Sequence, residues 1–144
     1  MVTKSAQETQ ALGEKIANQL IIKRQPLIIA LTGELGSGKT TFLQGLAKGL
    51  GIKERILSPT FIMMRSYPVT DHQSPVTNFY HVDLYRIESE RDIEGLGLEE
   101  IWSDPQNIIA LEWAEKIKKV LPKKRIDIFF KYVGEDEREI KIVE

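Results

Sequence analysis

The hydrophobic positions change their spacing along the chain, and this spacing separates helices from strands. Near the N-terminus apolar residues recur at helical intervals, which predicts an amphipathic helix over residues 6–22 capped by Ser5 or Thr9. Residues 27–31 are continuously apolar, as expected of a strand buried on both faces in a parallel sheet. A glycine-rich turn then leads into a second helical pattern over residues 39–50.

Strand patterns dominate the rest of the chain. Aromatic and β-branched residues predict strands at 61–67, 76–82 and 108–111, and a polar loop joins the first two. Helical segments are predicted at 88–101 and 114–121. The final stretch alternates over 126–133 and 139–143 around a turn at Gly134-Glu135-Asp136, which is typical of an antiparallel hairpin.

The order of these elements predicts an α/β fold. We expect a mostly parallel sheet flanked by helices, with an antiparallel C-terminal edge hairpin. The length of 144 residues suits a single domain spanning 1–144.

Composition narrows the functional classes. Twenty basic and 21 acidic residues give a formal net charge of -1, so there is no overall basic field that favours nucleic-acid binding. The absence of cysteine excludes disulfides and thiolate chemistry. The polar N-terminus lacks the apolar core of a signal peptide, and no apolar run is long enough to cross a bilayer. We therefore expect a cytoplasmic protein that makes no membrane contact.

The turn after the first predicted strand carries a nucleotide-binding pattern. G-x-x-x-x-G-K-[ST] is matched by Gly33, Glu34, Leu35, Gly36, Ser37, Gly38, Lys39 and Thr40. Glycines let successive backbone N–H groups point at phosphate oxygens, and the following helix adds the positive end of its dipole. In such a loop Lys39 reaches the β- and γ-phosphates, the Thr40 hydroxyl binds Mg²⁺, and Thr41 could bond the α-phosphate. The alternative, a glycine-rich turn without a ligand, is disfavoured by the buried strand before it and the helix after it.

Two carboxylates end predicted strands. Asp83 follows the run Phe79-Tyr80-His81-Val82, and Glu112 follows residues 108–111. Parallel strands bring their C-terminal ends to one rim of the sheet, so both acids are candidates to hold Mg²⁺ or to orient an attacking water. The alternative for each is a strand-end acid that pairs with a surface base.

Three further residues have two interpretations each. Thr60, in Ser58-Pro59-Thr60, could sense the γ-phosphate, but a simple turn is favoured by the sequence alone. His81 alternates with Asp83 and could share its face of the sheet, although a packed or surface histidine is the more common situation. Trp113 could stack on a nucleotide or a partner, or it could cover the core.

Other charged patterns add little. Asp92 to Gly95 fits the D-x-x-G pattern of GTPases but follows a polar stretch, and no Asn-Lys-x-Asp motif for guanine occurs, so ATP is favoured over GTP. Six of the ten residues in 116–125 are basic, which suits a solvated helix end better than an RNA contact. No arginine finger is evident, although Arg65 or Arg86 could approach the site, or a partner could supply one.

These residues together resemble the bacterial tRNA threonylcarbamoyladenosine biosynthesis ATPases, the TsaE or YjeE family. The resemblance covers nearly the whole chain. It is carried by Leu31 to Leu46 (LTGELGSGKTTFLQGL), Ser58-Pro59-Thr60-Phe61, Tyr80 to Arg86 (YHVDLYR), Gly95 to Leu98 and Leu111-Glu112-Trp113.

The resemblance implies a P-loop fold that binds ATP and Mg²⁺ and hydrolyses ATP slowly alone. It also implies that the chain joins the TsaB–TsaD protein complex, so that ATP hydrolysis supports formation of threonylcarbamoyladenosine beside the anticodon of tRNA. The tRNA would then be contacted only indirectly, through that complex.

The resemblance also assigns roles to individual residues. It implies that Lys39 and Thr40 bind phosphate and Mg²⁺, that Asp83 is an acid needed for activity, and that Glu112 is a second acid near Mg²⁺. It places Thr60 in a switch-like segment.

The match is less direct at three positions. The resemblance aligns Thr9, before the first helix, with a threonine that approaches the adenine. Glu34 and Ser37 stand where the family commonly has Asp and Ala, and neither change removes a phosphate donor.

Two other functions remain compatible with the P-loop. A small-molecule kinase would need an acceptor pocket and an arginine-bearing lid, for which the acid-interleaved region 86–91 is a poor candidate. A non-catalytic nucleotide sensor would use ATP only to control binding to a partner. The sequence does not predict the oligomeric state.

Overall fold

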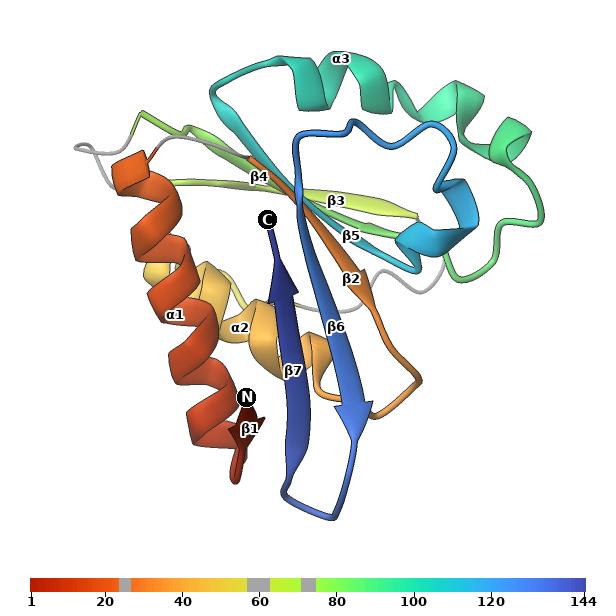
Figure 1. Ribbon diagram of the computed structural model, residues 1–144. Helices are drawn as coiled ribbons and strands as arrows, with labels where there is room; N and C mark the ends of the chain where they lie inside the picture. The colour runs from red at the N-terminus through yellow and green to blue at the C-terminus, as the bar shows by residue number, and fades with distance from the viewer. Residues whose placement is uncertain (24–26, 57–62, 71–74) are drawn as a thin grey trace.

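One seven-stranded sheet runs through the protein in the order β1-β7-β6-β2-β5-β4-β3 (Figure 1). The computed structural model describes residues 1–23, 27–56, 63–70 and 75–144. The strands are β1 (Val2–Thr3), β2 (Ile28–Thr32), β3 (Met64–Pro68), β4 (Asn78–Asp83), β5 (Asn107–Glu112), β6 (Ile126–Tyr132) and β7 (Arg138–Val143). The helices are α1 (Ala6–Lys23), α2 (Lys39–Gly49) and α3 (Leu98–Ser103), with the 3-10 helices η1 (Glu90–Leu96) and η2 (Ala114–Ile117).

The centre of the sheet is parallel and both edges are antiparallel. β2 pairs in parallel with β5 and with β6, and β4 pairs in parallel with β5. The predicted β6–β7 hairpin is confirmed as antiparallel. Two features were not predicted: β3 pairs antiparallel with β4 at the other edge, and β1 pairs antiparallel with β7. The α/β fold class with a mostly parallel core is therefore confirmed, with a second antiparallel edge added.

Alternating strand residues divide the core into two layers. Ile29 and Leu31 of β2 pack with α1 and α2 on one face, whereas Ile28 and Ala30 pack on the other face with α3 and η2. Figure 1 shows α1 and α2 together at one side of the sheet and α3 away from them. This two-sided burial explains why the strand was continuously apolar in the sequence.

Helices α1 and α2 touch at their backbones. A Cβ atom added at Gly45 of α2 would lie 1.9 Å from the carbonyl oxygen of Gln10, and one added at Gly13 of α1 would lie 2.3 Å from that of Phe42. Any side chain at these positions would force the helices apart. The glycines therefore allow α1 to fix the position of the helix that opens at Lys39.

The predicted helices are largely confirmed, with three corrections. Ser5, and not Thr9, caps α1, because the Ser5 Oγ accepts a hydrogen bond from the Glu8 N–H at 3.1 Å. Thr9 lies inside α1 and not before it. The predicted helix 88–101 is divided into η1 and α3 at Gly97, whose φ of 67° is left-handed. The last predicted helix is shorter than expected and is a 3-10 helix, η2. In the described parts of the chain, no helix is both long and apolar enough to cross a membrane.

Candidate active site

The P-loop pattern lies where the sequence predicts it, between the end of β2 and the start of α2. Gly38, the residue before the helix, has φ 103° and ψ 7°, a conformation that residues with side chains rarely adopt. Gly33 begins the loop so close to β6 that a Cβ atom there would lie 2.7 Å from the carbonyl oxygen of Phe130. The glycines at these two positions are therefore required by the fold of the loop.

The start of α2 has no side-chain cap. The cap position is occupied by Gly38, which has no side chain that could bond the free backbone N–H groups, and the first turn contains no acidic residue. The first N–H groups of a helix have no partner within the helix, and together with the helix dipole they attract anions. This end of α2 is therefore suited to bind a phosphate.

The Lys39 side chain contacts both the P-loop and Trp113, the residue that follows β5. Its side chain is 5% exposed, and its Nζ donates a hydrogen bond to the Gly33 carbonyl oxygen at 2.6 Å. The same Nζ lies 4.4 Å from the centre of the Trp113 ring, a cation–π contact. The ammonium group is thus held at the mouth of the loop by two weak acceptors that a phosphate can replace.

Trp113 is held in an unusual backbone conformation. With φ 59°, it is the one residue other than glycine that has a positive φ in the described ranges. Its ring lies 5.2 Å from that of Tyr85, and the Lys116 Nζ lies over both rings. Trp113 also packs against the core layer that contains α3. It therefore covers the core, as one interpretation predicted, and also covers the P-loop lysine.

Asp83 and Glu112 end adjacent parallel strands and are register partners. Strands β2 and β5 are aligned in the same way, since Glu112 is opposite Leu31, close to the start of the P-loop. The expectation that the strand ends bring the two acids together is therefore confirmed. Glu112 lies beside His81, a buried residue, and not beside a surface base.

His81 fixes the orientation of Glu112. The His81 side chain is completely buried, Glu112 is 4% exposed, and the His81 Nε2 lies 2.7 Å from the Glu112 Oε2. His81 therefore shares the face of the sheet from which the acids project and is not a surface residue. The other ring nitrogen, Nδ1, is buried and has no partner among the described residues. A buried donor without an acceptor is costly, so Nε2 is the nitrogen that donates a proton to the Glu112 carboxylate.

Asp83 differs from Glu112 in its surroundings. It is half-buried, and its Oδ1 accepts a hydrogen bond from the Tyr85 N–H at 3.0 Å. Burial, together with the nearby Glu112 carboxylate, raises the pKa of Asp83, although the Tyr85 N–H, His81 and Lys39 act in the opposite direction. The strand register places Asp83 beside Glu112, and Glu112 opposite Leu31, close to the start of the P-loop.

The remaining predicted site residues differ in exposure and in the contacts that they make. Thr40 is exposed and Thr41 is half-buried in the first turn of α2, while Glu34 and Leu35 are exposed at the tip of the loop. The Thr9 hydroxyl is buried and lies 2.7 Å from the Thr3 Oγ1, so it bonds within the N-terminal segment. The predicted switch residue, Thr60, lies outside the described residues.

The donor set suits Mg²⁺ bound together with a nucleotide. Within the described residues, no group of three His, Cys, Asp or Glu side chains could hold a metal ion by itself. Mg²⁺ typically takes one or two protein ligands and completes its shell with phosphate oxygens and water, which a hydroxyl at Thr40 and a carboxylate at Glu112 would allow.

Unpaired buried polar atoms gather around this region. In the described part of the chain, the buried side-chain nitrogen and oxygen atoms without a hydrogen bond are Ser37 Oγ, His81 Nδ1 and Arg138 Nε. Ser37 belongs to the P-loop, His81 bonds Glu112, and Arg138 lies beside Gly38. Buried polar groups are nearly always paired in folded proteins, so this concentration indicates a site that is completed by a ligand.

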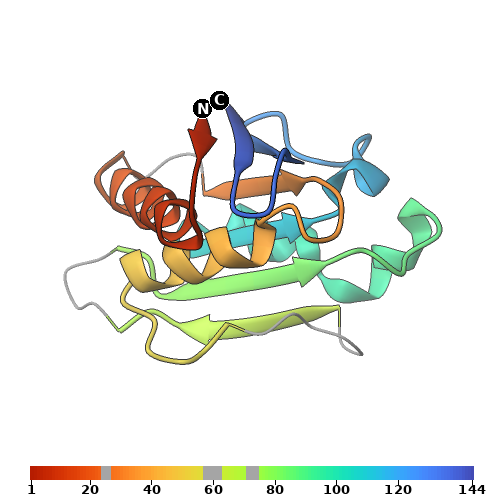
Figure 2. The same cartoon turned by 90° about the horizontal axis from the view of Figure 1, so that it is seen from below.

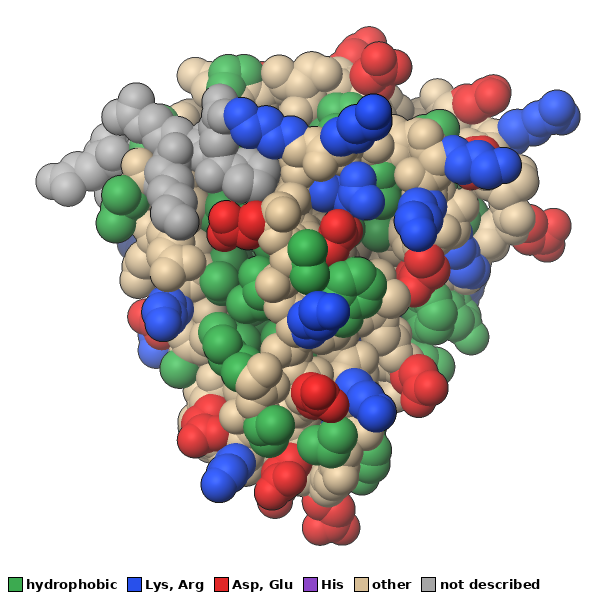
Figure 3. Space-filling view, viewed as in Figure 1, with side chains coloured by type: hydrophobic (Ala, Val, Ile, Leu, Met, Phe, Trp, Pro, Cys, Tyr) green, Lys and Arg blue, Asp and Glu red, His purple; other side chains and the backbone are tan. Residues whose placement is uncertain are grey.

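The predicted basic segment is only partly available to a partner. Lys116 donates hydrogen bonds to the carbonyl oxygens of Tyr85 and Ile87, and Arg125 pairs with Asp127 at 2.9 Å. Figure 3 shows positive and negative side chains interspersed over this face of the molecule. The segment therefore contributes to the fold through Lys116 and Arg125, while its other four basic residues, Lys118, Lys119, Lys123 and Lys124, are exposed.

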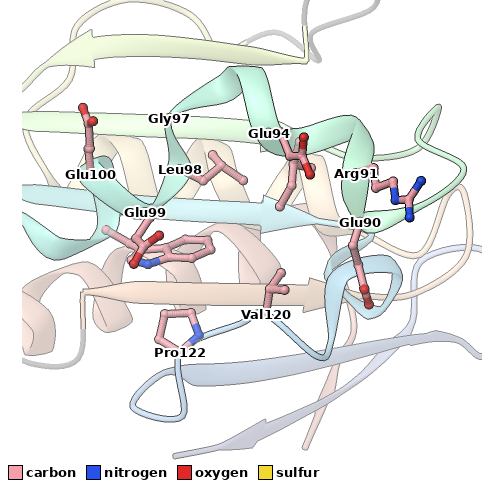
Figure 4. Close-up of a pocket in the computed structure, with 11 residues that line it drawn as sticks. Glu90, Arg91, Glu94, Gly97, Leu98, Glu99, Glu100, Val120 and Pro122 are labelled. Carbon is pink, nitrogen blue, oxygen red and sulfur yellow. The ribbon is translucent and has the colours of Figure 1, made fainter.

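A separate groove lies away from the P-loop. It has a volume of about 950 Å³, and its walls come from η1 and α3 on one side and from Val120 and Pro122 on the other (Figure 4). Its rim is acidic, with Glu90, Glu94 and Glu99 among the lining residues. None of the predicted site residues lines it, so the groove is not part of the candidate active site.

The chain is similar to several known proteins. A family model described as "Threonylcarbamoyl adenosine biosynthesis protein TsaE" matches residues 3–140. The "tRNA threonylcarbamoyladenosine biosynthesis protein TsaE" of Bacillus subtilis is 39% identical over 138 residues, covering 96% of this chain and 80% of that protein. The Treponema pallidum protein of the same description is 33% identical and covers 98% and 97%. A crystal structure of YdiB from Bacillus subtilis superimposes with a TM-score of 0.74 at 34% identity, covering 97% of this chain and 80% of that one. The chain therefore belongs to the TsaE family.

Proposed function

We propose that this chain is the ATP-binding and slowly ATP-hydrolysing component of the cytoplasmic complex that forms threonylcarbamoyladenosine next to the anticodon of tRNA. In this proposal ATP hydrolysis supports turnover of the TsaB–TsaD partners. Membership of the TsaE family supports the role in tRNA modification. The observation that carries the ATPase assignment is the strand register, which aligns the start of the P-loop with two strand-end carboxylates, Asp83 and Glu112.

Binding of the nucleotide would use the P-loop. Gly33 to Thr41 present backbone N–H groups to the phosphates, and Lys39 exchanges its bonds to the Gly33 carbonyl and the Trp113 ring for the β- and γ-phosphates. The Thr40 hydroxyl and the Glu112 carboxylate would hold Mg²⁺. When bound, Mg²⁺ neutralises charge on the phosphate oxygens and aligns them.

The two acids would have separate tasks. Glu112 is buried and fixed by His81, which suits a ligand whose geometry must not change. Asp83 is half-exposed, and its raised pKa makes it a stronger base than an ordinary aspartate. We therefore assign to Asp83 the orientation of the attacking water and to Glu112 the support of the metal.

The experiment that tests the proposal combines two measurements. Single-turnover phosphate release is measured for the chain alone and with TsaB and TsaD, and tRNA modification is measured in parallel. The proposal predicts slow release alone, faster release in the complex, and modification only when the chain is present. If no phosphate appears even with both partners, the chain is a nucleotide-dependent switch and not an ATPase. A phosphorylated metabolite formed from ATP would instead identify a small-molecule kinase.

A further inference from the structure

We propose that Arg138 binds the phosphate chain of the nucleotide held by the P-loop. The inference rests on the nucleotide-binding function proposed above and adds a residue that lies outside the P-loop pattern. Arg138 is the first residue of β7 and follows the turn of the β6–β7 hairpin. Because β6 pairs with β2, the hairpin turn comes to lie beside the P-loop, as the view in Figure 2 shows.

The Arg138 side chain runs along Gly38, the glycine that precedes Lys39. A Cβ atom added at Gly38 would lie 3.4 Å from the Arg138 Cγ, 3.7 Å from its Cδ and 3.8 Å from its Nε. Gly38 is the residue immediately before α2, where backbone N–H groups are free to bind phosphate. The arginine thus approaches the start of α2 from the side of the hairpin.

The guanidinium group is held in place by the hairpin turn. Its Nη1 donates hydrogen bonds to the carbonyl oxygens of Gly134 at 2.8 Å, Glu137 at 2.8 Å and Glu135 at 3.2 Å. Its central carbon lies 4.6 Å from the centre of the Tyr132 ring. These contacts occupy one nitrogen and one face of the group, so the orientation of the remaining nitrogens is fixed before any ligand binds.

The Nε atom of Arg138 takes no part in the contacts with the hairpin turn. It is buried and has no hydrogen-bond partner among the described residues. A role limited to closing the turn would account for the bonds of Nη1 but not for a buried Nε without an acceptor, because such donors are nearly always paired. A phosphate oxygen beside Gly38 is an acceptor of the kind that the guanidinium group prefers.

Arg138 is a third arginine that could neutralise charge on the phosphates. The sequence analysis named Arg65 and Arg86 as arginines that could approach the site. Arg65 lies exposed on β3, the strand at the far edge of the sheet, and Arg86 is exposed after β4. Arg138, which the sequence analysis did not single out, is in contact range of Gly38 in the P-loop. The chain itself therefore supplies an arginine at the phosphate site.

The test uses calorimetric titration of the full chain with MgATP, MgADP and MgGTP. We compare Arg138→Gln and Arg138→Lys with Arg125→Gln, a control that removes the same charge from a residue paired with Asp127. Loss of a charge-assisted hydrogen bond is expected to weaken MgATP binding by Arg138→Gln about 10- to 100-fold. Arg138→Lys, which keeps the charge but not the planar fork, is expected to bind with intermediate affinity, and the control should match the wild type.

Each outcome decides between the two proposals. If the wild type does not bind MgATP, the nucleotide-binding function itself fails. If the wild type binds and Arg138→Gln binds equally well, the assignment of Arg138 is overturned. A loss confined to the adenine nucleotides would show contact with the base and would also overturn the phosphate assignment.

A second measurement uses the wild-type chain, so its result does not depend on whether the variants fold. The side-chain Nε–H resonance of Arg138 is followed by nitrogen-15 NMR during addition of MgATP. The proposal requires this resonance to shift as the Nε acquires an acceptor, while that of Arg125 stays in place. An unchanged Arg138 resonance at saturating MgATP would contradict the inference, whatever the variants show.

Discussion

The buried pair of His81 and Glu112 gives the sharpest prediction about stability. Replacing His81 with leucine removes the group that lies 2.7 Å from a carboxylate that is only 4% exposed. A hydrogen bond to a charged group contributes about 1.5–3 kcal/mol, and a buried charge left without its partner costs about 3–5 kcal/mol. We therefore expect His81→Leu to lower the free energy of unfolding by about 3 kcal/mol.

This loss is large on the scale of a single domain. Typical domains are stable by only about 5–15 kcal/mol. An unfolding entropy of about 2.1 cal/mol/K per residue, taken over 144 residues, gives about 0.3 kcal/mol/K. A loss of 3 kcal/mol then corresponds to a decrease in Tm of roughly 10 °C. Urea denaturation at pH 7 and differential scanning calorimetry both measure the effect.

A double-mutant cycle separates the pair from simple loss of packing. If the leucine acts by leaving Glu112 unpaired, then adding Glu112→Met to His81→Leu should recover much of the lost stability, because the buried charge is gone. The reasoning would be refuted if His81→Leu cost less than about 0.5 kcal/mol, which is the usual effect of a surface substitution. Strictly additive effects of the two substitutions would refute it as well.

Three other predictions follow from the same site. Lys39→Ala should weaken MgATP binding in calorimetry, whereas Asp83→Ala should retain most of the binding and abolish tRNA modification; equal losses of affinity would contradict their separate roles. Because burial raises the pKa of Asp83, the folded state binds a proton more readily than the unfolded state. The free energy of unfolding therefore falls as the pH rises above 3.8 and passes through the pKa of Asp83 in the folded state. Asp83→Asn should therefore unfold at a higher temperature than the wild type at pH 7, and its advantage should vanish by pH 3.8; an advantage that does not change with pH would refute this. In a Trp102→Phe variant, Trp113 is the one remaining tryptophan. Addition of MgATP should change the fluorescence of Trp113, because Lys39 leaves its ring. The double variant that also carries Lys39→Ala should show no such change.

The parts of the fold that could be predicted have local signals. The strand before the P-loop, the glycine-rich turn and α2 lie within one residue of the predicted bounds. Each is specified by neighbouring residues: a continuous apolar run, glycines with a left-handed φ, and a helical pattern. The meeting of Asp83 with Glu112 was also predictable, because parallel strands align their C-terminal ends.

The missed features depend on contacts between distant segments. No local pattern tells that the short segment Val2–Thr3 pairs with β7, or that β3 runs antiparallel to β4. The partner of His81 is 31 residues away in the sequence, and Arg138 reaches Gly38 only because β6 pairs with β2. A basic residue after a predicted hairpin turn was visible in the sequence, but only the strand order brings it to the P-loop.

The backbone contact between α1 and α2 affects how the protein can move. With Gly13 and Gly45 in contact with the opposite helix, the two helices cannot slide or separate without a steric clash or a void, so they move as one rigid body. The P-loop is anchored to that body at Lys39. On the other face of the sheet, η1 and α3 are short and are joined at Gly97, whose backbone is left-handed. The face of the sheet that carries α1 and α2 is therefore the stiffer of the two, and a change of shape meets less steric resistance on the face that carries η1 and α3.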